Sequence, residues 1–88
     1  MNQSEAAFDD AEARSFLLDM LIGMRHLAAL TQTEVGRRMG GISQATVAGL
    51  ETKGDDPKLS TLQRYARAVG AELVLEIRLH DPDDETDV

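Results

Sequence analysis

The sequence predicts a mainly α-helical protein in which four or five short helices precede one C-terminal β-strand. Two patterns predict this fold. Between residues 10 and 70 the apolar side chains recur every three or four positions, which is typical of helices packed on one core. After Gly70 the period changes to two, which is typical of a strand. With 88 residues and only 3% aromatic residues, the chain should form one domain with a small aliphatic core.

The first two helices follow from an apolar stripe and a capping signal. The first is expected over residues 10–29. Its stripe consists of Phe16, Leu17, Met20, Leu21, Met24, Leu27 and Ala28. Thr31 should cap the second helix, because Glu34 three residues later completes a capping box. Val35 and Met39 should face inward from this short helix.

Glycines and a hydroxyl side chain mark the third helix. Gly40-Gly41 should end the second helix, and Ser43 should cap a third helix over Gln44–Thr52. Its inward positions would be Val47 and Leu50.

The fourth helix should begin at Ser60 or Thr61, and Gly70 should follow its C-terminal end. Its inward side chains would be Leu62, Tyr65, Ala66 and Val69. Residues 10–70 thus form the expected helical domain.

Residues 71–80 are expected to form a dimerisation strand. The apolar side chains alternate with mostly polar ones, and they are Leu73, Leu75, Ile77 and Leu79. A single strand leaves its backbone N–H and C=O groups unpaired along both edges. The simplest partner is the same strand of a second copy, in an antiparallel ribbon packed on the helices. The alternative is a short β-hook folded against its own helices.

The net charge of −7 and the pI near 4.6 argue at first against nucleic-acid binding. The acidity, however, is terminal. Residues 1–24 carry five acids and one base, and residues 81–88 carry five acids. Residues 25–53 carry four bases and two acids, so the middle of the chain is positive. We interpret residues 1–9 as a flexible acidic N-terminus and residues 81–88 as a disordered acidic tail.

Composition excludes several other classes of protein. Without cysteine there is no disulfide and no thiolate metal site, and His26 and His80 lie far apart in the sequence, so neither a metal nor a cofactor is expected. No catalytic set is present, and Ser43 is interpreted as a helix cap. No apolar run approaches the ~18 residues of a membrane span. The N-terminus also lacks the pattern of a signal peptide. We therefore expect a cytoplasmic protein that does not enter a membrane.

Residues 31–51, TQTEVGRRMGGISQATVAGLE, contain two short helices joined by a glycine turn, an arrangement that indicates a helix-turn-helix. Over about residues 20–70 the chain resembles the lambda-repressor-like, Cro/cI-type (XRE) helix-turn-helix family. Four segments carry the resemblance, in the order of the family and nearly in its spacing: TQTEVGRRMG, ISQATV, LE and STLQRYARAVG. Within that family the chain looks most like antitoxins of the HigA and HipB type. The resemblance implies a homodimeric repressor of a palindromic DNA operator. It also implies a cognate toxin protein as a partner.

The resemblance also implies roles for individual residues. Gln32 matches a phosphate-contacting position, and Gln44 matches the strongest base-reading position, where a carboxamide can bond adenine. Ala45 offers a contact for a thymine methyl group. The expected DNA-binding set is Gln32, Thr33, Arg37, Ser43, Gln44, Ala45, Thr46, Gly49 and Lys53. Arg25 and Glu51 match a partly buried structural ion pair.

Three departures from the family pattern affect this interpretation. Gly36 replaces the usual Ala, a change we expect to be tolerated because the site requires only a small residue. Gly41 lengthens the turn by one residue. Ala48 and Gly49 stand where the family usually carries polar side chains. These two residues and the modest positive charge of residues 25–53 keep one alternative open, a protein-interaction module that has lost DNA readout. A second alternative is a stand-alone or phage-type regulator without a toxin, which the neighbouring gene would decide.

Overall fold

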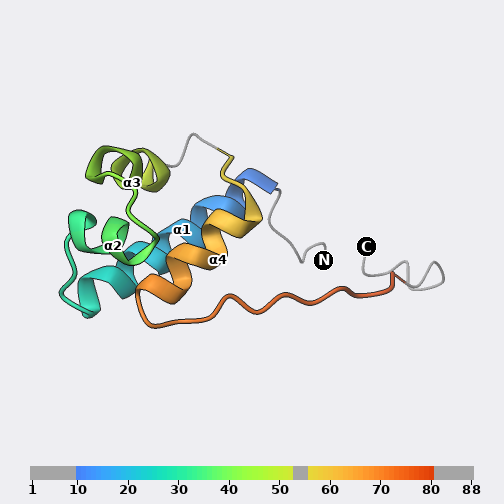
Figure 1. The fold of residues 1–88 in the computed structure, drawn as a ribbon. Helices are drawn as coiled ribbons and strands as arrows, with labels where there is room; N and C mark the ends of the chain where they lie inside the picture. The colour runs from blue at the N-terminus through green and yellow to red at the C-terminus, as the bar shows by residue number, and fades with distance from the viewer. Residues whose placement is uncertain (1–9, 53–55, 81–88) are drawn as a thin grey trace.

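The computed structural model describes residues 10–52 and 56–80. The described part contains four helices, α1 (Asp10–Leu27), α2 (Gln32–Arg38), α3 (Gln44–Glu51) and α4 (Leu59–Ala68) (Figure 1). The mainly α-helical fold that the sequence predicts is therefore confirmed for the described residues.

The caps of α2 and α3 are those expected from the sequence. The Thr31 hydroxyl accepts from the Glu34 backbone N–H at 3.0 Å, and the Glu34 carboxylate accepts from the Thr31 N–H at 2.8 Å. This capping box satisfies two N–H groups that have no partner within the helix. The Ser43 hydroxyl accepts from the Thr46 N–H at 3.1 Å. Both predicted starts are confirmed, because each hydroxyl stands directly before the first helical residue.

The start of α4 differs slightly from the prediction. The helix begins at Leu59 rather than at Ser60 or Thr61, and its N-cap residue is Lys58, whose side chain makes no capping bond. The extended backbone of Lys58 places its carbonyl to accept from the N–H groups of Thr61 and Leu62. A preceding Pro57 favours such a start, but the sequence pattern contained no hydroxyl cap to reveal it.

One hydrophobic cluster joins all four helices. Its buried members are Leu18, Leu21, Val35, Met39, Val47, Leu50, Leu62, Tyr65, Ala66, Ala68 and Val69. Gly70 follows α4 with φ +86°, in the position expected for a residue after the C-cap. The inward positions predicted for α2, α3 and α4 are all buried.

The buried face of α1 coincides with the predicted stripe only in part: Leu21 is buried, and Leu17 and Met24 pack against the core. Leu18, which lies outside that stripe, is 1% exposed, whereas Phe16 is 53% and Met20 is 45% exposed. The helix carries more apolar residues than one face can hold, so periodicity alone did not select the buried face. Arg25, a charged residue, takes an inward position one and two turns below Leu21 and Leu18. The buried face of the helix therefore runs through Leu18, Leu21 and Arg25.

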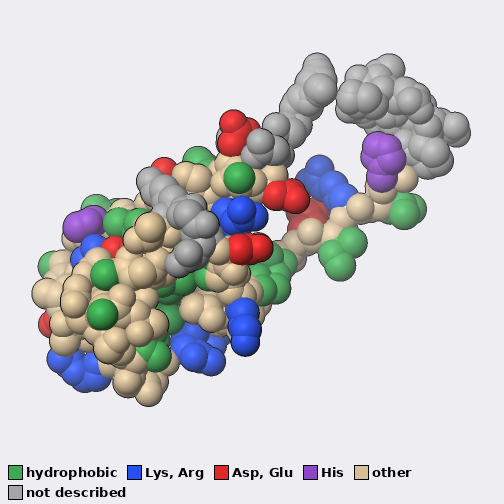
Figure 2. All heavy atoms as spheres, turned by 90° about the horizontal axis from the view of Figure 1, so that it is seen from above, with side chains coloured by type: hydrophobic (Ala, Val, Ile, Leu, Met, Phe, Trp, Pro, Cys, Tyr) green, Lys and Arg blue, Asp and Glu red, His purple; other side chains and the backbone are tan. Residues whose placement is uncertain are grey.

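Residues 71–80, called the arm below, leave the end of α4 as an elongated segment (Figure 1). Within the described part of the chain the arm pairs with no strand, so the C-terminal strand remains a prediction. Its root contacts the core through Ala71 and Leu73, but Ile77 is 98% and Leu79 is 97% exposed. Hydrophobic side chains project along it beyond the helices (Figure 2). The arm therefore does not form the alternative β-hook against its own helices.

The two acidic ends, residues 1–9 and 81–88, lie outside the described residues. No helix in the described ranges combines the length and the apolar character needed to cross a bilayer.

Candidate nucleic-acid interface

The turn between α2 and α3 closes on the backbone of Gly36. The Gly36 carbonyl accepts from the N–H groups of both Gly41 and Ile42, each at 3.0 Å. Gly40 and Gly41 have φ +104° and +93°, values that side chains strongly disfavour. Two consecutive left-handed residues thus reverse the chain and set the start of α3 against α2, which completes the helix-turn-helix.

The structure accommodates Gly36, but the expectation that this site requires only a small residue is wrong. A Cβ at this position would clash with the Ile42 carbonyl oxygen and would lie 3.3 Å from a Val47 methyl group. Smallness is therefore not sufficient, and alanine requires the turn to shift. The longer turn supplies the physical reason, because the residue after Gly41 carries the carbonyl that lies against Gly36.

The first turn of α3 forms the outer surface of the motif. Ser43, Gln44, Ala45 and Thr46 are all exposed, and so is Thr33 on α2. The Ser43 and Thr46 hydroxyls lie 2.9 Å apart and bond to each other. Further along α3, Ala48 and Gly49, which were expected to face outward, are half-buried. The N-terminal half of α3 is therefore the part best placed to enter a DNA groove.

Beneath this surface lies a buried ion pair. Arg25 Nε donates to Glu51 Oε2 at 2.8 Å, and Arg25 Nη2 donates to Glu51 Oε1 at 3.1 Å. Their side chains are 10% and 8% exposed. The remaining Arg25 amine donates to the Leu30 carbonyl at 3.0 Å. Bidentate geometry with extra hydrogen bonds is what a buried ion pair needs to offset its desolvation.

Tyr65 completes this pair, a role that the sequence analysis missed. Its hydroxyl donates to Glu51 Oε2 at 2.6 Å, although Tyr65 was expected only as a core residue. A fully buried tyrosine generally needs a hydrogen-bond partner, and this is the signal that would have revealed its role. The bond ties α4 to the end of α3, and with Arg25 from α1 and Gln32 from α2 all four helices meet at the Glu51 carboxylate.

These contacts shift the acidities of the three groups. Burial alone would raise the pKa of Glu51, but hydrogen bonds from Arg25, Tyr65 and Gln32 outweigh it and hold that pKa below its ordinary value. Burial, and then the bond to Glu51, raises the pKa of Tyr65. The hydrogen bond to Glu51 raises the pKa of Arg25. The carboxylate and the guanidinium are therefore charged, and the phenol neutral, across the physiological range.

Gln32 links the buried pair to the outer surface. Its side-chain N–H donates to Glu51 Oε1 at 2.9 Å, and its Oε1 accepts from the Gln44 side chain at 2.5 Å. Gln32 is half-buried rather than a solvated cap. A continuous chain of side-chain contacts thus runs from Arg25 in the core to Gln44 on the surface.

The cationic residues fall into different environments. Arg25 is neutralised by Glu51, so it adds no free positive charge to the surface. Arg38 donates to the Ala68 carbonyl at 3.1 Å and so helps to satisfy the C-terminal end of α4. Arg37 is exposed in the last turn of α2. Lys53 lies outside the described residues.

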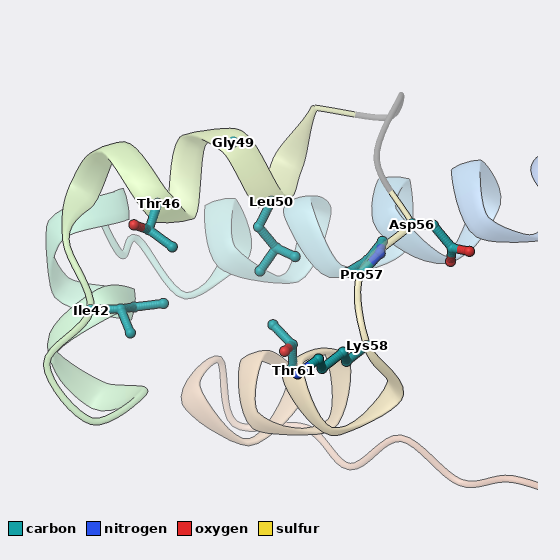
Figure 3. A pocket seen from close by; sticks show the side chains of 8 residues that line it. All are labelled: Ile42, Thr46, Gly49, Leu50, Asp56, Pro57, Lys58 and Thr61. Carbon is teal, nitrogen blue, oxygen red and sulfur yellow. The ribbon is translucent and has the colours of Figure 1, made fainter.

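An open groove of about 630 Å³ runs beside α3 (Figure 3). Thr46, Gly49 and Leu50 line it from α3, with Ile42 from the turn; the opposite side is lined by Asp56, Pro57, Lys58 and Thr61. Lys58 therefore joins the cationic residues near α3, because it lines the same groove as Thr46. No motif in the sequence pointed to Lys58, because the fourth helix was expected to start later.

The fold and this surface define a class. The family model described as helix-turn-helix matches residues 24–75, more than half of the chain, and the chain belongs to that family.

Among curated proteins, the chain is 51% identical over 75 residues to two proteins named Antitoxin HigA1. They come from Mycobacterium tuberculosis strains CDC 1551 / Oshkosh and ATCC 25618 / H37Rv. The matched region covers 83% of this chain and 50% of each relative, so the chain spans about half their length. No solved structure matches significantly.

Proposed function

We propose that this chain is a sequence-specific DNA-binding repressor that acts as the antitoxin of a toxin–antitoxin pair. The observation that carries the DNA-binding part is the exposed first turn of α3, presented by a helix-turn-helix and centred on Gln44. In this proposal Gln44 bonds an adenine edge, Ala45 contacts a thymine methyl group and Thr46 lies near a base or phosphate.

Phosphate contacts would come from residues around α3. Gln32 lies at the start of α2, and Arg37, Lys53 and Lys58 supply the positive charge. Gly49 allows close approach of the DNA backbone, because nothing lies within 4 Å of the position that its Cβ would occupy. Thr33 and Ser43 complete the proposed interface, with the Ser43 hydroxyl already shared with Thr46.

The protein would bind as a homodimer. Two copies related by a twofold axis would place their α3 helices in successive major grooves of a palindromic operator, with half-sites about 34 Å apart. The exposed leucine and isoleucine side chains of the arm support this assembly, and the arm is the proposed dimerisation strand.

The antitoxin part of the proposal rests on the similarity to relatives whose printed name is Antitoxin HigA1. In this proposal the protein represses its own operon and neutralises a partner toxin. The candidate contact surfaces are α1 and the acidic C-terminal tail.

Gel shifts with the protein's own promoter region test DNA readout. Gln44→Ala should weaken specific binding by about 10- to 100-fold, because one bidentate base contact contributes roughly 1–3 kcal/mol of discrimination. Gln63→Ala, a glutamine in α4, is the matched control and should bind as the parent does. Equal affinity of Gln44→Ala and the parent would remove Gln44 from the interface.

Salt dependence tests whether the surface binds DNA at all. The logarithm of affinity should fall linearly with the logarithm of salt concentration, with a slope of about −0.9 for each neutralised phosphate. Arg37→Gln and Lys58→Gln should each make the slope less steep by about one unit per phosphate contact removed. A protein without measurable affinity at low salt would instead be an interaction module.

Co-expression tests the toxin. If the reading frame adjacent to this gene encodes a growth inhibitor, the chain should restore growth and co-purify with that product as a stoichiometric complex. Unrelieved inhibition without a complex would leave a stand-alone regulator.

A further inference from the structure

The arm carries two faces of different chemistry. Leu73, Leu75, Ile77 and Leu79 occupy alternate positions of the arm. The other face carries Glu72, Val74, Glu76, Arg78 and His80, which are polar except for Val74. Arg78 Nε lies 3.3 Å from Glu76 Oε2, so these two side chains lie on one side of the arm. At the root of the arm, Ala71 and Leu73 contact the core. At its root, the apolar face of the arm is therefore turned toward the helices, whereas Ile77 and Leu79 on the same face are almost fully exposed.

An apolar groove of about 380 Å³ lies where the arm begins. Met24, Leu27 and Ala28 line it from the C-terminal end of α1 and the residue after it, and Val69, Gly70 and Ala71 line it from the end of α4 and the start of the arm. Leu27 is 89% exposed. The groove and the arm thus form one continuous apolar surface.

Charge limits the ways in which two arms can pair. In a twofold antiparallel ribbon, the residue on the axis determines every cross-strand pair, and like charges directly opposite are destabilising. An axis at Glu76 or Arg78 places that residue opposite its own copy. An axis at Val74 places Glu72 opposite Glu76. An axis at Glu72 again pairs that residue with its own copy, and an axis at Ala71, Leu73, Leu79 or His80 pairs at most five residues of the arm. Only axes at Leu75 and Ile77 remain.

The two remaining registers differ at their ends. An axis at Ile77 pairs Glu76 with Arg78, but it pairs only residues 74–80 of the arm and leaves Ala71 at the groove without a partner from the second arm. An axis at Leu75 pairs residues 71–79 of each copy and places Glu72 opposite Arg78. It also places Leu79 of the second copy beside Ala71, at the groove. Only this register combines complementary charges with an occupant for the groove.

We infer that two copies of this chain pair through antiparallel arms with the twofold axis at Leu75, and that Leu79 of each copy occupies the groove between α1 and α4 of the other. The inference rests on the homodimer of the proposed function and specifies its interface.

Cysteine cross-linking tests the register, because the chain contains no cysteine of its own. Leu75→Cys places two thiols opposite each other, where Cα separations of about 4.5–5.5 Å permit a disulfide. Ile77→Cys is the matched control, since its two copies would lie about 14 Å apart along the ribbon. After mild oxidation, Leu75→Cys should give at least about tenfold more covalent dimer than Ile77→Cys.

Each other outcome identifies a different failure. More cross-linking of Ile77→Cys than of Leu75→Cys would overturn the register and leave the ribbon. Failure of both variants to cross-link, with a dimeric mass by light scattering, would overturn the ribbon and leave the homodimer. A monomeric mass for the parent chain would overturn the homodimer itself.

Charge exchange gives a second test. Glu72→Arg and Arg78→Glu should each weaken dimerisation by about 3- to 30-fold, and the two together should restore it, because the cross-strand pair is reversed. Glu76→Arg combined with Arg78→Glu is the control and should not restore dimerisation. Restoration by the control and not by the first pair would overturn the axis at Leu75.

Substitution in the groove tests its occupant. Leu79→Ala should weaken the dimer about tenfold or more through lost apolar burial, and Leu27→Ala should add little in that background. Fully additive effects would remove Leu79 from the groove.

Discussion

The helical body, the described part of residues 10–70, and the arm use similar apolar residues in opposite ways. In the body, Leu18 and Val35 are 1% and 0% exposed, whereas in the arm Ile77 is 98% exposed. The same contrast holds for ion pairs. Arg25 and Glu51 are buried with several further partners, and Glu76 and Arg78 form a pair that is 69% and 83% exposed. In the body these apolar and charged side chains are buried against other helices, whereas in the arm they are exposed.

This contrast shows that periodicity reports which residues seek burial, but not which chain buries them. The four helices of the body bury their apolar side chains in one shared core within about 60 residues, because each helix packs against the others. The arm meets the helices only at its root, so most of its apolar side chains remain exposed in a single chain. Substitutions in the body should therefore change the free energy of unfolding, and substitutions in the arm should change the proposed dimerisation.

The largest effect is expected from breaking the buried pair. Arg25→Ala should lower the free energy of unfolding by about 3–5 kcal/mol, since it leaves the Glu51 carboxylate buried and unpaired. Arg78→Ala, which removes the exposed pair of the arm, should change it by less than about 1 kcal/mol. Urea denaturation of both variants measures the difference. Equal destabilisation would contradict the contrast between body and arm.

A smaller effect is expected from a methyl group in the turn. Gly36→Ala should cost about 1–3 kcal/mol, because the added Cβ displaces the Ile42 carbonyl. Gly23→Ala is the matched control, in open space on α1, and should stabilise by up to about 1 kcal/mol. Thermal unfolding of the two variants gives shifts of opposite sign. A neutral Gly36→Ala would mean that the longer turn adjusts freely.

Acid should weaken the body through Glu51. Its folded-state pKa lies below the ordinary value of 4.5, so its contribution to stability is present above pH 4.5 and is lost as pH falls through the folded-state pKa. Glu51→Gln should flatten the dependence of unfolding free energy on pH below this value. Glu34 retains its own share, since the hydrogen bond to the Thr31 N–H lowers its pKa as well. A slope unchanged from that of the parent would exclude Glu51 as a source.

The smallest effect on folding is expected in the arm. Ile77→Ser should leave the unfolding free energy of dilute monomer within about 0.5 kcal/mol of the parent value, since the side chain is 98% exposed. In the proposed ribbon it should nevertheless weaken dimerisation. Denaturation at low concentration and light scattering at high concentration separate the two quantities. A large loss of monomer stability would place Ile77 in the core.

Much of the body could be predicted because its signals are local. Thr31 with Glu34, and Ser43, identify helix starts through hydrogen bonds within four residues, and glycine identifies the turn. The buried face of α1 could be predicted only in part, because Arg25 takes an inward position only in the presence of Glu51 from another helix. The strict need for glycine at position 36 depends equally on a distant carbonyl.

The candidate site likewise contains residues that the sequence could predict and contacts that it could not. The resemblance placed Gln32 and Gln44 at the start of two helices, and the structure adds the contact between them. The hydroxyl of Tyr65 and the groove beside Lys58 arise where α4 meets α3, a juxtaposition that spacing along the chain does not encode.

The chain of contacts from Arg25 through Glu51 and Gln32 to Gln44 has a consequence for the entropy of recognition. A long, freely rotating side chain loses about 0.5–1.5 kcal/mol when a complex immobilises it. Gln44 has already given up part of that freedom on folding, because Gln32 holds its amide. In the proposed complex, part of the entropy cost of ordering Gln44 would therefore already be met on folding. Gln32→Ala would free the Gln44 side chain, so this cost would fall on DNA binding although no atom of Gln44 is removed.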